Sequence, residues 1–199
     1  TLDRSSAASD VYKRQEIIRM NVQFIDELAL DAETKLQIAD LMKLCFPEED
    51  FHGRHYFKQL PHYRLLLKNQ NQLIGQLGLD YRVMTLNGEP INVLGVMEFA
   101  IHPKYQKQGM ARLLLNELDH LAQRFQANID FLFLVADQHD FYRKFGFQLT
   151  AQHARWLVTE EHINYGMKEG FFDACLMYKQ VGTKPWVENG NLDFMGYWY

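Results

Sequence analysis

The stretch from residue 91 to residue 136 constrains the fold of this chain more than any other. Residues 91–101 read as a β-strand that stops before Pro103, which cannot donate to a strand ladder. Apolar residues then recur every three or four positions from Met110 to Phe125, the pattern of an amphipathic helix. Residues 129–136 form an almost unbroken apolar run, as expected for a buried strand. This order predicts a helix packed on a sheet.

The N-terminal part predicts one short strand followed by two helices. Residues 21–24 alternate as a strand does. Asp31 is a good N-cap for a helix whose apolar face continues until Pro47 ends it. A second, shorter helix is expected over residues 51–60.

A hairpin and a later short helix flank the central stretch. Residues 63–68 and 72–86 read as strands, and the dipeptide Asn87–Gly88 is a strong hairpin signal that leads into the strand at residue 91. Residues 138–145 are expected to form a short helix.

The C-terminal part predicts two more strands. They cover residues 147–158 and 171–179, with a loop containing Gly166 and Gly170 between them. Residues 182–199 are expected to be irregular. The whole order predicts an α/β (α+β) fold with a mixed sheet and helices on its faces.

Composition excludes several classes of protein. The chain has 199 residues, which suits one domain, and 21 basic against 25 acidic residues give a net charge of -4. No nucleic-acid partner is expected without a basic excess. The longest apolar run has six residues, so no membrane span is expected and the protein is expected to be cytoplasmic.

Residue types also limit the chemistry. The two cysteines cannot build a disulfide framework, and the eight histidines show no metal-ligand spacing, so no metal is expected. Serine occurs only at positions 5, 6 and 9, which excludes a serine nucleophile in the folded domain.

The first 19 residues are treated apart from the domain. Residues 1–15 are rich in small polar residues, and the string SSAASDVYKRQ within them resembles peptides translated from sequencing adapters; the alternative is a genuine flexible N-terminus. We expect a leader over residues 1–19, a domain over residues 20–179, and an aromatic tail over residues 180–199 that packs on the domain.

A loop suited to phosphate follows the strand that ends at Ile101. Gln106 to Ala111 opens the long helix, and Gly109 permits close approach of a ligand to the backbone. Successive backbone N–H groups and the helix dipole favour an anion there. Lys104, Lys107 and Arg112 add positive charge.

Three motifs resemble those of the GNAT acyltransferase superfamily. Gln106-x-x-Gly109-x-Ala111 resembles its acyl-CoA pyrophosphate motif. The run from Glu98 to Pro103, EFAIHP, resembles the strand end before that motif, and the run from Asp140 to Phe147, DFYRKFGF, resembles a later segment of the same families. The resemblance covers residues 20 to about 179.

The resemblance implies a GNAT-like mixed, mostly antiparallel sheet flanked by helices, with acetyl-CoA as co-substrate in a splay between the strands at residues 91–101 and 129–136. The implied cofactor-binding residues are Phe99, Ala100, Ile101, Gln106, Lys107, Gln108, Gly109, Met110, Ala111 and Arg112. The backbone near Phe99 and Ile101 would pair with the pantetheine arm, and the Phe99 N–H would polarise the thioester carbonyl.

The reaction needs a base and an acid. Glu98 is the nearby candidate base for the amine, directly or through water, although the family does not fix the position of this carboxylate and some members use ordered water instead; the alternative for Glu98 is a carboxylate that faces solvent or only holds the substrate cation. Tyr142 is the candidate acid for the departing thiolate, and positioning would have to compensate for a phenol pKa near 10. The alternative for Tyr142 is core packing.

The expected function is acetyl-CoA-dependent N-acetylation of a primary amine on a small molecule. Aminoglycoside acetylation, longer-chain N-acyl transfer and a non-catalytic acyl-CoA-binding module remain alternatives, and a homodimer is one expected assembly. The tail, with Trp186, Phe194 and residues 197–199, resembles that of aminoglycoside 2′-N-acetyltransferases and nodulation-type N-acyltransferases. It would shape the acceptor pocket or simply pack. The acidic residues 48–50 either complement a helix dipole or attract the acceptor.

Overall fold

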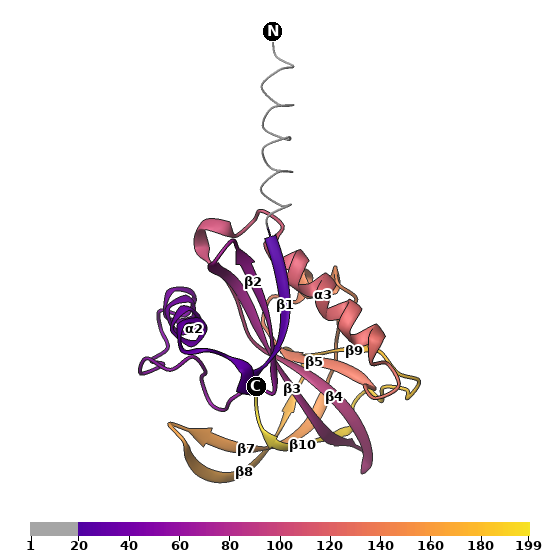
Figure 1. Ribbon diagram of the computed structural model, residues 1–199. Coiled ribbons are helices and arrows are strands. Elements are labelled where there is room, and N and C mark those ends of the chain that lie inside the picture. The colour runs from indigo at the N-terminus through magenta and orange to yellow at the C-terminus, as the bar shows by residue number, and fades with distance from the viewer. Residues whose placement is uncertain (1–19) are drawn as a thin grey trace.

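The structure is a computed structural model that describes residues 20–199 (Figure 1). Its strands are β1 (Met20–Asp26), β2 (Tyr63–Asn69), β3 (Gln72–Leu86), β4 (Glu89–Ile101), β5 (Phe131–Val135), β6 (Gln148–Leu149), β7 (Gln152–Glu160), β8 (Ile163–Phe172), β9 (Leu176–Gln180) and β10 (Asn191–Tyr197). Its helices are α2 (Ala32–Cys45), α3 (Met110–Arg124) and α4 (His139–Arg143), with 3-10 turns η1 (Glu27–Ala29) and η2 (Pro103–Tyr105).

The described strands form one mixed sheet. Its order is β6-β9-β5-β4-β3-β10-β7-β8, and β2 pairs with β3 and carries β1 on its other side. The pairs β4 with β5 and β10 with β7 are parallel, and the other described pairs are antiparallel. The expected α+β fold with a mostly antiparallel sheet is confirmed.

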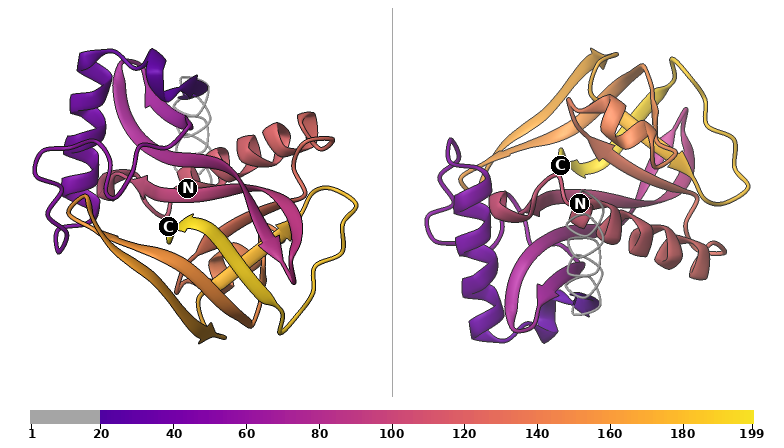
Figure 2. Two further views of the ribbon diagram at one scale, coloured as in Figure 1. Left: turned by 90° about the horizontal axis from the view of Figure 1, so that it is seen from below. Right: turned by 90° about the horizontal axis from the view of Figure 1, so that it is seen from above.

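Helices α2 and α3 cover opposite faces of this sheet (Figure 2). Strand β2 shows why both faces are covered, because three successive leucines in it are fully buried. Leu65 and Leu67 belong to the core under α3, whereas Leu66 belongs to the core under α2. Successive residues of a strand point to opposite faces, so an unbroken apolar run can fill both cores.

The elements with the strongest local sequence signals are present as predicted. The amphipathic helix predicted from Met110 is confirmed in α3. Asp31 caps α2, because its carboxylate accepts the Thr34 N–H at 2.7 Å. Asn87 and Gly88 form the turn between β3 and β4, and both have a positive φ.

Strand β4 is paired along its length on one side and only partly on the other. Its pairing with β3 runs from Glu89 to Ile101. Its parallel pairing with β5 involves only Val93–Val96. Within residues 20–199 no strand pairs with that edge beyond Val96. The sheet therefore opens between β4 and β5 toward the end of β4.

The prediction of a helix over residues 51–60 is wrong. These residues form turns and bends, and His52 and Gly53 have φ of 48° and 75°, which no helix accommodates. Phe51 is buried in the core under α2. The Phe57 N–H donates to the Glu98 carboxylate instead of to a helical carbonyl. Tertiary partners thus outweighed a modest helix propensity.

Two expectations for the C-terminal part are also wrong. The strand expected over residues 147–158 is divided into β6 and β7, because β6 pairs with β9 while β7 pairs with β8 and β10. The loop expected around Gly166 and Gly170 is strand β8. Gly166 has a φ of 89° and lies where the register with β7 shifts, so it marks a bulge.

The final segment is not irregular throughout, because residues 191–197 form β10. This strand lies between β3 and β7, and its Leu192 and Phe194 are buried in a second core with Phe131 and Phe133. Trp186 packs against the same core. The sheet therefore continues into the segment that we expected to lie on the domain as a tail.

The leader expected over residues 1–19 lies outside the described residues. In residues 20–199 no helix combines the length and apolar character that crossing a membrane requires.

Candidate active site

A bulge in β4 lies at the point where the sheet opens. Gln76 pairs with Ala100 and Gly78 with Met97, so Glu98 and Phe99 together oppose one residue of β3. Glu98 has a φ of 53°, which is uncommon for a residue with a side chain. Such a bulge disrupts the ladder locally and redirects backbone and side chains.

The Glu98 carboxylate is buried and held by two donors. Its Oε1 accepts the Phe57 N–H at 2.6 Å, and its Oε2 lies 3.2 Å from Nη1 of Arg64. Its side chain is 5% exposed. Burial raises the pKa of the Glu98 carboxyl, although Arg64 and the Phe57 N–H oppose that change. A raised pKa moves the group toward the range suited to a general base.

Arg64 is the fully buried cation that holds this region together. It donates from Nε to Glu27 at 2.6 Å, from Nη1 to the Gln76 side chain at 2.8 Å, and from Nη2 to the His55 carbonyl at 2.9 Å. The His55 ring lies 2.7 Å from Glu27. Burial lowers the pKa of His55, and its hydrogen bond with Glu27 opposes the change. Arg64 therefore joins β2, β3, β4 and the irregular segment before β2.

The predicted phosphate loop is exposed and its backbone is shaped for close approach. Residues 106–109 are exposed, and Lys107 and Gly109 have φ of 59° and 87°. No hydrogen bond within the described residues uses the N–H groups of residues 107–109. The Gln106 amide donates to the Ile101 carbonyl at 3.0 Å, which ties the loop to the end of β4.

The other predicted cofactor residues divide between backbone and side-chain roles. Met110 is buried in the core, so only its backbone is available to a ligand, and Ala111 is half-buried. Gln108 donates to the Lys104 carbonyl at 2.6 Å, and Arg112 is exposed on α3. Ala100 packs toward α2 and Ile101 toward α3, so these two also offer a ligand their backbone.

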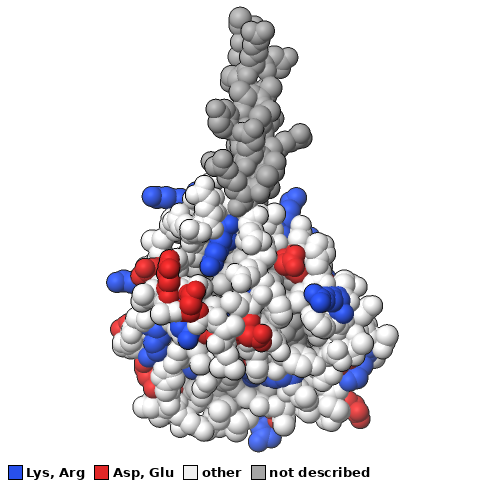
Figure 3. Space-filling model, viewed as in Figure 1, with Lys and Arg blue, Asp and Glu red and all other residues white. Residues whose placement is uncertain are grey.

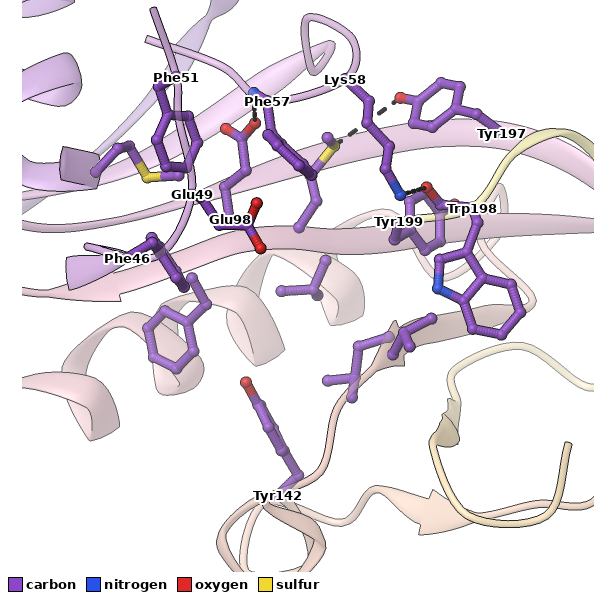
Figure 4. Close-up of a pocket in the computed structure, with 16 residues that line it drawn as sticks. Phe46, Glu49, Phe51, Phe57, Lys58, Glu98, Tyr142, Tyr197, Trp198 and Tyr199 are labelled. Atoms are coloured by element: carbon purple, nitrogen blue, oxygen red, sulfur yellow. Dashed lines mark hydrogen bonds between the residues drawn. The ribbon is translucent and has the colours of Figure 1, made fainter. Parts of the chain in front are cut away.

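Tyr142 on α4 faces the bulge from the other side of the opening. Its ring contacts those of Phe99, Phe141 and Phe147, with centroids 6.4, 5.0 and 5.9 Å away. Its hydroxyl has no hydrogen-bond partner among the described residues. Burial raises the pKa of Tyr142 to about 12. In Figure 4 the phenol points into the pocket described next.

A pocket of about 300 Å³ brings Glu98, Phe99 and Tyr142 together. Its other lining residues are Met42, Phe46, Glu49, Phe51, Phe57, Lys58, Val96, Met97, Leu134, Val135, Tyr197, Trp198 and Tyr199. Figure 4 shows aromatic side chains from the segment before β2 on one side and from the C-terminal segment on the other. The phosphate loop does not line this pocket.

Sequence reasoning missed Phe46, Phe51, Phe57 and Lys58 as lining residues, and it offered a role at the acceptor for residues 48–50 as only one of two alternatives. The one available signal was the acidic run at residues 48–50 next to several aromatic residues. Because no helix forms there, the interpretation of this run as a complement to a helix dipole is wrong. Glu49 lines the pocket instead.

The C-terminal wall is anchored by a cation. The Arg82 guanidinium lies 4.2 Å from the centroid of the Tyr197 ring and 4.9 Å from that of Tyr199, and it donates to the Tyr197 carbonyl. Asp80 forms an ion pair with Arg82. Lys58 reaches across to the Trp198 carbonyl at 3.2 Å (Figure 4). The wall is therefore fixed by polar contacts as well as by packing.

The charge of the pocket comes from a few residues within it. On the face drawn in Figure 3, basic and acidic side chains are interspersed. Glu49, Lys58 and Glu98 are the charged residues of the lining. Burial lowers the pKa of Lys58, and Glu49 opposes that change.

Comparison with protein families gives one result. A family model described as an acetyltransferase (GNAT) domain matches residues 29–150. The matched range contains the bulge, the phosphate loop and Tyr142. A search of curated protein sequences finds no match.

Solved structures show the same fold at low identity. Escherichia coli YhbS, a GNAT family N-acetyltransferase in complex with CoA, has a TM-score of 0.55 and 18% identity, covering 88% of this chain and 89% of that chain. A GNAT family acetyltransferase of Brucella melitensis in complex with acetyl-CoA has a TM-score of 0.52 and 15% identity, covering 86% and 94%.

A third similar structure is much longer. It is a protein of Enterococcus faecalis V583 described as a probable N-acyltransferase, with a TM-score of 0.53 and 17% identity. The match covers 66% of this chain but only 33% of that one, so the chain spans about a third of its length.

Proposed function

Because this chain belongs to the GNAT acetyltransferase family and is therefore a transferase, we propose that it transfers an acetyl group from acetyl-CoA directly to a primary amine of a small molecule. The observation that carries the proposal is the bulge at Glu98 and Phe99, which lies at the open edge of β4 and faces Tyr142 across a pocket. An acyl donor along the open edge and an amine in the pocket would meet at this bulge.

The residues present fit acetyl-CoA. Beyond Val96 one edge of β4 has no strand partner in the described part of the chain, so an extended pantetheine arm can pair with the backbone near Phe99 and Ile101. The exposed N–H groups of residues 107–109 suit a pyrophosphate at the start of α3. Acetyl-CoA would supply the activated acetyl group, and the Phe99 N–H would polarise its carbonyl.

Glu98 is proposed to take the proton that the amine loses. A protonated alkyl amine has no free electron pair and cannot attack a carbonyl. The raised pKa of the Glu98 carboxyl suits this task. The Glu98 side chain is only 5% exposed, so a small bridging water reaches it more easily than the amine does and is the simpler route for the proton.

Tyr142 is proposed to stabilise the departing thiolate with a hydrogen bond, and the thiolate then takes its proton from water. With a pKa of about 12 the phenol stays protonated over the working range. Complete transfer to a sulfur whose thiol has a pKa of about 8.5 is unfavourable. Tyr142 would therefore act through the position of its proton, by donating a hydrogen bond to sulfur as negative charge develops there. Its free hydroxyl inside the pocket supports this role.

Tyr142→Phe tests the proposal, because it keeps the ring and its packing but removes the proton. We expect kcat to fall by about 10²–10³, the range for a lost hydrogen-bond donor to charge that develops in the transition state, with little change in the Kd of acetyl-CoA. Because of the high pKa of Tyr142, the wild-type rate should not fall through ionisation of this phenol up to about pH 10. Thiol release with a panel of amines measures the rate, and calorimetry measures binding.

Tyr105→Phe is the matched control, because Tyr105 is a half-buried tyrosine outside the pocket lining. It should leave kcat unchanged. A folded Tyr142→Phe enzyme with the wild-type rate would make Tyr142 a packing residue. A wild-type protein that binds acetyl-CoA but releases no thiol with any amine would instead be a non-catalytic acyl-CoA-binding module.

A further inference from the structure

Glu49 is a carboxylate at the pocket whose nearest established charge partner, Lys58, acts on it electrostatically without forming an ion pair with it. Its side chain forms no hydrogen bond or ion pair with any residue in the range 20–199, and it is exposed. Glu98 differs, because Arg64 lies 3.2 Å from its carboxylate and offsets its charge. Glu49 is therefore the side chain of the lining that is available to pair with a cation from outside.

The walls next to Glu49 and Glu98 are largely aromatic. Phe46, Phe51 and Phe57 line one side, and Tyr197 and Trp198 line the other (Figure 4). These ring faces attract an ammonium group and pack well against apolar carbon. A ligand hydroxyl placed against these ring faces, away from the Tyr142 hydroxyl, would lose its hydrogen bonds to water without gaining a partner.

Size and charge restrict the ligand further. A volume of about 300 Å³ is at the lower end for small-molecule sites, which span roughly 300–1,000 Å³. Lys58 places a cation in the same lining. A second or third ammonium group on the ligand would lie close to the cation of Lys58 in this small space. Only one carboxylate without a direct partner, Glu49, would be there to offset these charges. Both facts disfavour a polycationic, polyhydroxylated amino sugar.

We propose that the acceptor is a compact hydrophobic primary monoamine, of the arylalkylamine kind, whose ammonium group is first bound by Glu49 and whose carbon body lies between the aromatic walls. This inference rests on the proposed function, since it takes the pocket as the acceptor site. Glu49 acts on the charged ground state of the amine, and Glu98 acts later on its proton. Glu49 is thus a specificity residue and not the base.

Binding of 2-phenylethylamine to the full chain with CoA present tests the proposal without turnover. We expect Glu49→Gln to raise its Kd by about 3–10-fold, as for a partly exposed charge-assisted contact. Glu48→Gln is the matched control, because Glu48 is adjacent and exposed but does not line the pocket, and it should stay within about twofold of wild type. The neutral analogue 2-phenylethanol should bind wild type and Glu49→Gln equally.

Kinetics with a second set of amines complete the test. We expect kcat/KM for 2-phenylethylamine to exceed that for kanamycin and for spermidine by at least tenfold in wild type. Glu49→Gln should raise KM for 2-phenylethylamine while kcat is largely retained. A reversed order of amines, or an unchanged Kd in folded Glu49→Gln, overturns the proposal.

These outcomes separate the inference from the proposed function. Binding of 2-phenylethylamine that depends on Glu49, without acetyl transfer to any amine, would support the specificity of the pocket and refute the proposed reaction. Acetylation of 2-phenylethylamine with no dependence on Glu49 would support the reaction and refute the role of Glu49.

Discussion

Arg64 shows how one residue can decide the arrangement of a site. It is fully buried, and its guanidinium contacts two carboxylates, Glu27 at 2.6 Å and Glu98 at 3.2 Å. The planar guanidinium has five donors, which allows it to serve several acceptors at once. Without it, two acidic side chains would share a dry region with no cation between them. The position of Glu98 in the pocket depends on this cation.

We expect Arg64→Met to lower the free energy of unfolding by about 3–5 kcal/mol, because removal of one partner leaves buried charge uncompensated. Urea denaturation measures the change. Arg155→Met is the control, since Arg155 is half-exposed and lies 3.6 Å from an exposed Glu169; it should cost at most about 1 kcal/mol. A loss as small as that of the control would mean that Arg64 contributes little. Adding Glu27→Gln to Arg64→Met should restore part of the stability.

Among the elements, the turn between β4 and α3 has to meet two requirements. It must leave backbone N–H groups free, and it must start a helix directly behind them. Gly109 meets the first with a φ of 87°, and no atom lies within 4 Å of the place its Cβ would occupy. The turn therefore has open space in front of it, where a pyrophosphate can approach the backbone.

We expect Gly109→Glu to weaken acetyl-CoA binding by at least about 100-fold, because it places a side chain and a negative charge in this space. Calorimetry on the folded variant measures the affinity. Gly88→Glu is the matched control, because Gly88 has a φ of 84°, open space around it and a position in the distant β3–β4 turn. An equal loss of affinity in both variants, or none in Gly109→Glu, would argue against a phosphate site at this turn.

At the scale of the whole molecule, β10 connects the site to the sheet. It joins β3 to β7, and the segment that follows it carries two residues of the pocket wall, Trp198 and Tyr199. Phe194 of β10 is fully buried and packs against Phe133 and Trp198, with centroids 5.6 and 5.3 Å away. The pocket wall formed by Trp198 and Tyr199 therefore depends on an intact second core.

We expect Phe194→Ala to lower the free energy of unfolding by about 3–5 kcal/mol, as for other buried phenylalanines. It should also raise the KM of the amine, because the wall behind it loses support. Phe171→Ala on β8 is the control, since Phe171 is 50% exposed and should cost well under 1 kcal/mol. Denaturation and amine kinetics check both effects. An amine KM that stays at the wild-type value would show that the wall does not need β10.

Local sequence signals were sufficient for several elements. The cap at Asp31, the Asn87–Gly88 turn and the helix at Met110 each depend on interactions between residues close in the chain, so a short window contains the information. The motif at residues 106–111 is also a local signal, because consecutive residues build its loop.

The aromatic pocket, by contrast, depends on tertiary contacts. Residues 51–60 are irregular because Phe57 finds its acceptor on Glu98, 41 positions away. Residues 191–197 form a strand because β3 and β7 present free edges to them, although β3 lies more than 100 positions earlier. Hydrogen bonds to distant partners leave no periodic pattern in the chain. For this reason the main helices and the loop proposed to bind acyl-CoA could be predicted from local sequence, whereas the aromatic pocket and the place of Glu49 in it depend on contacts between distant residues.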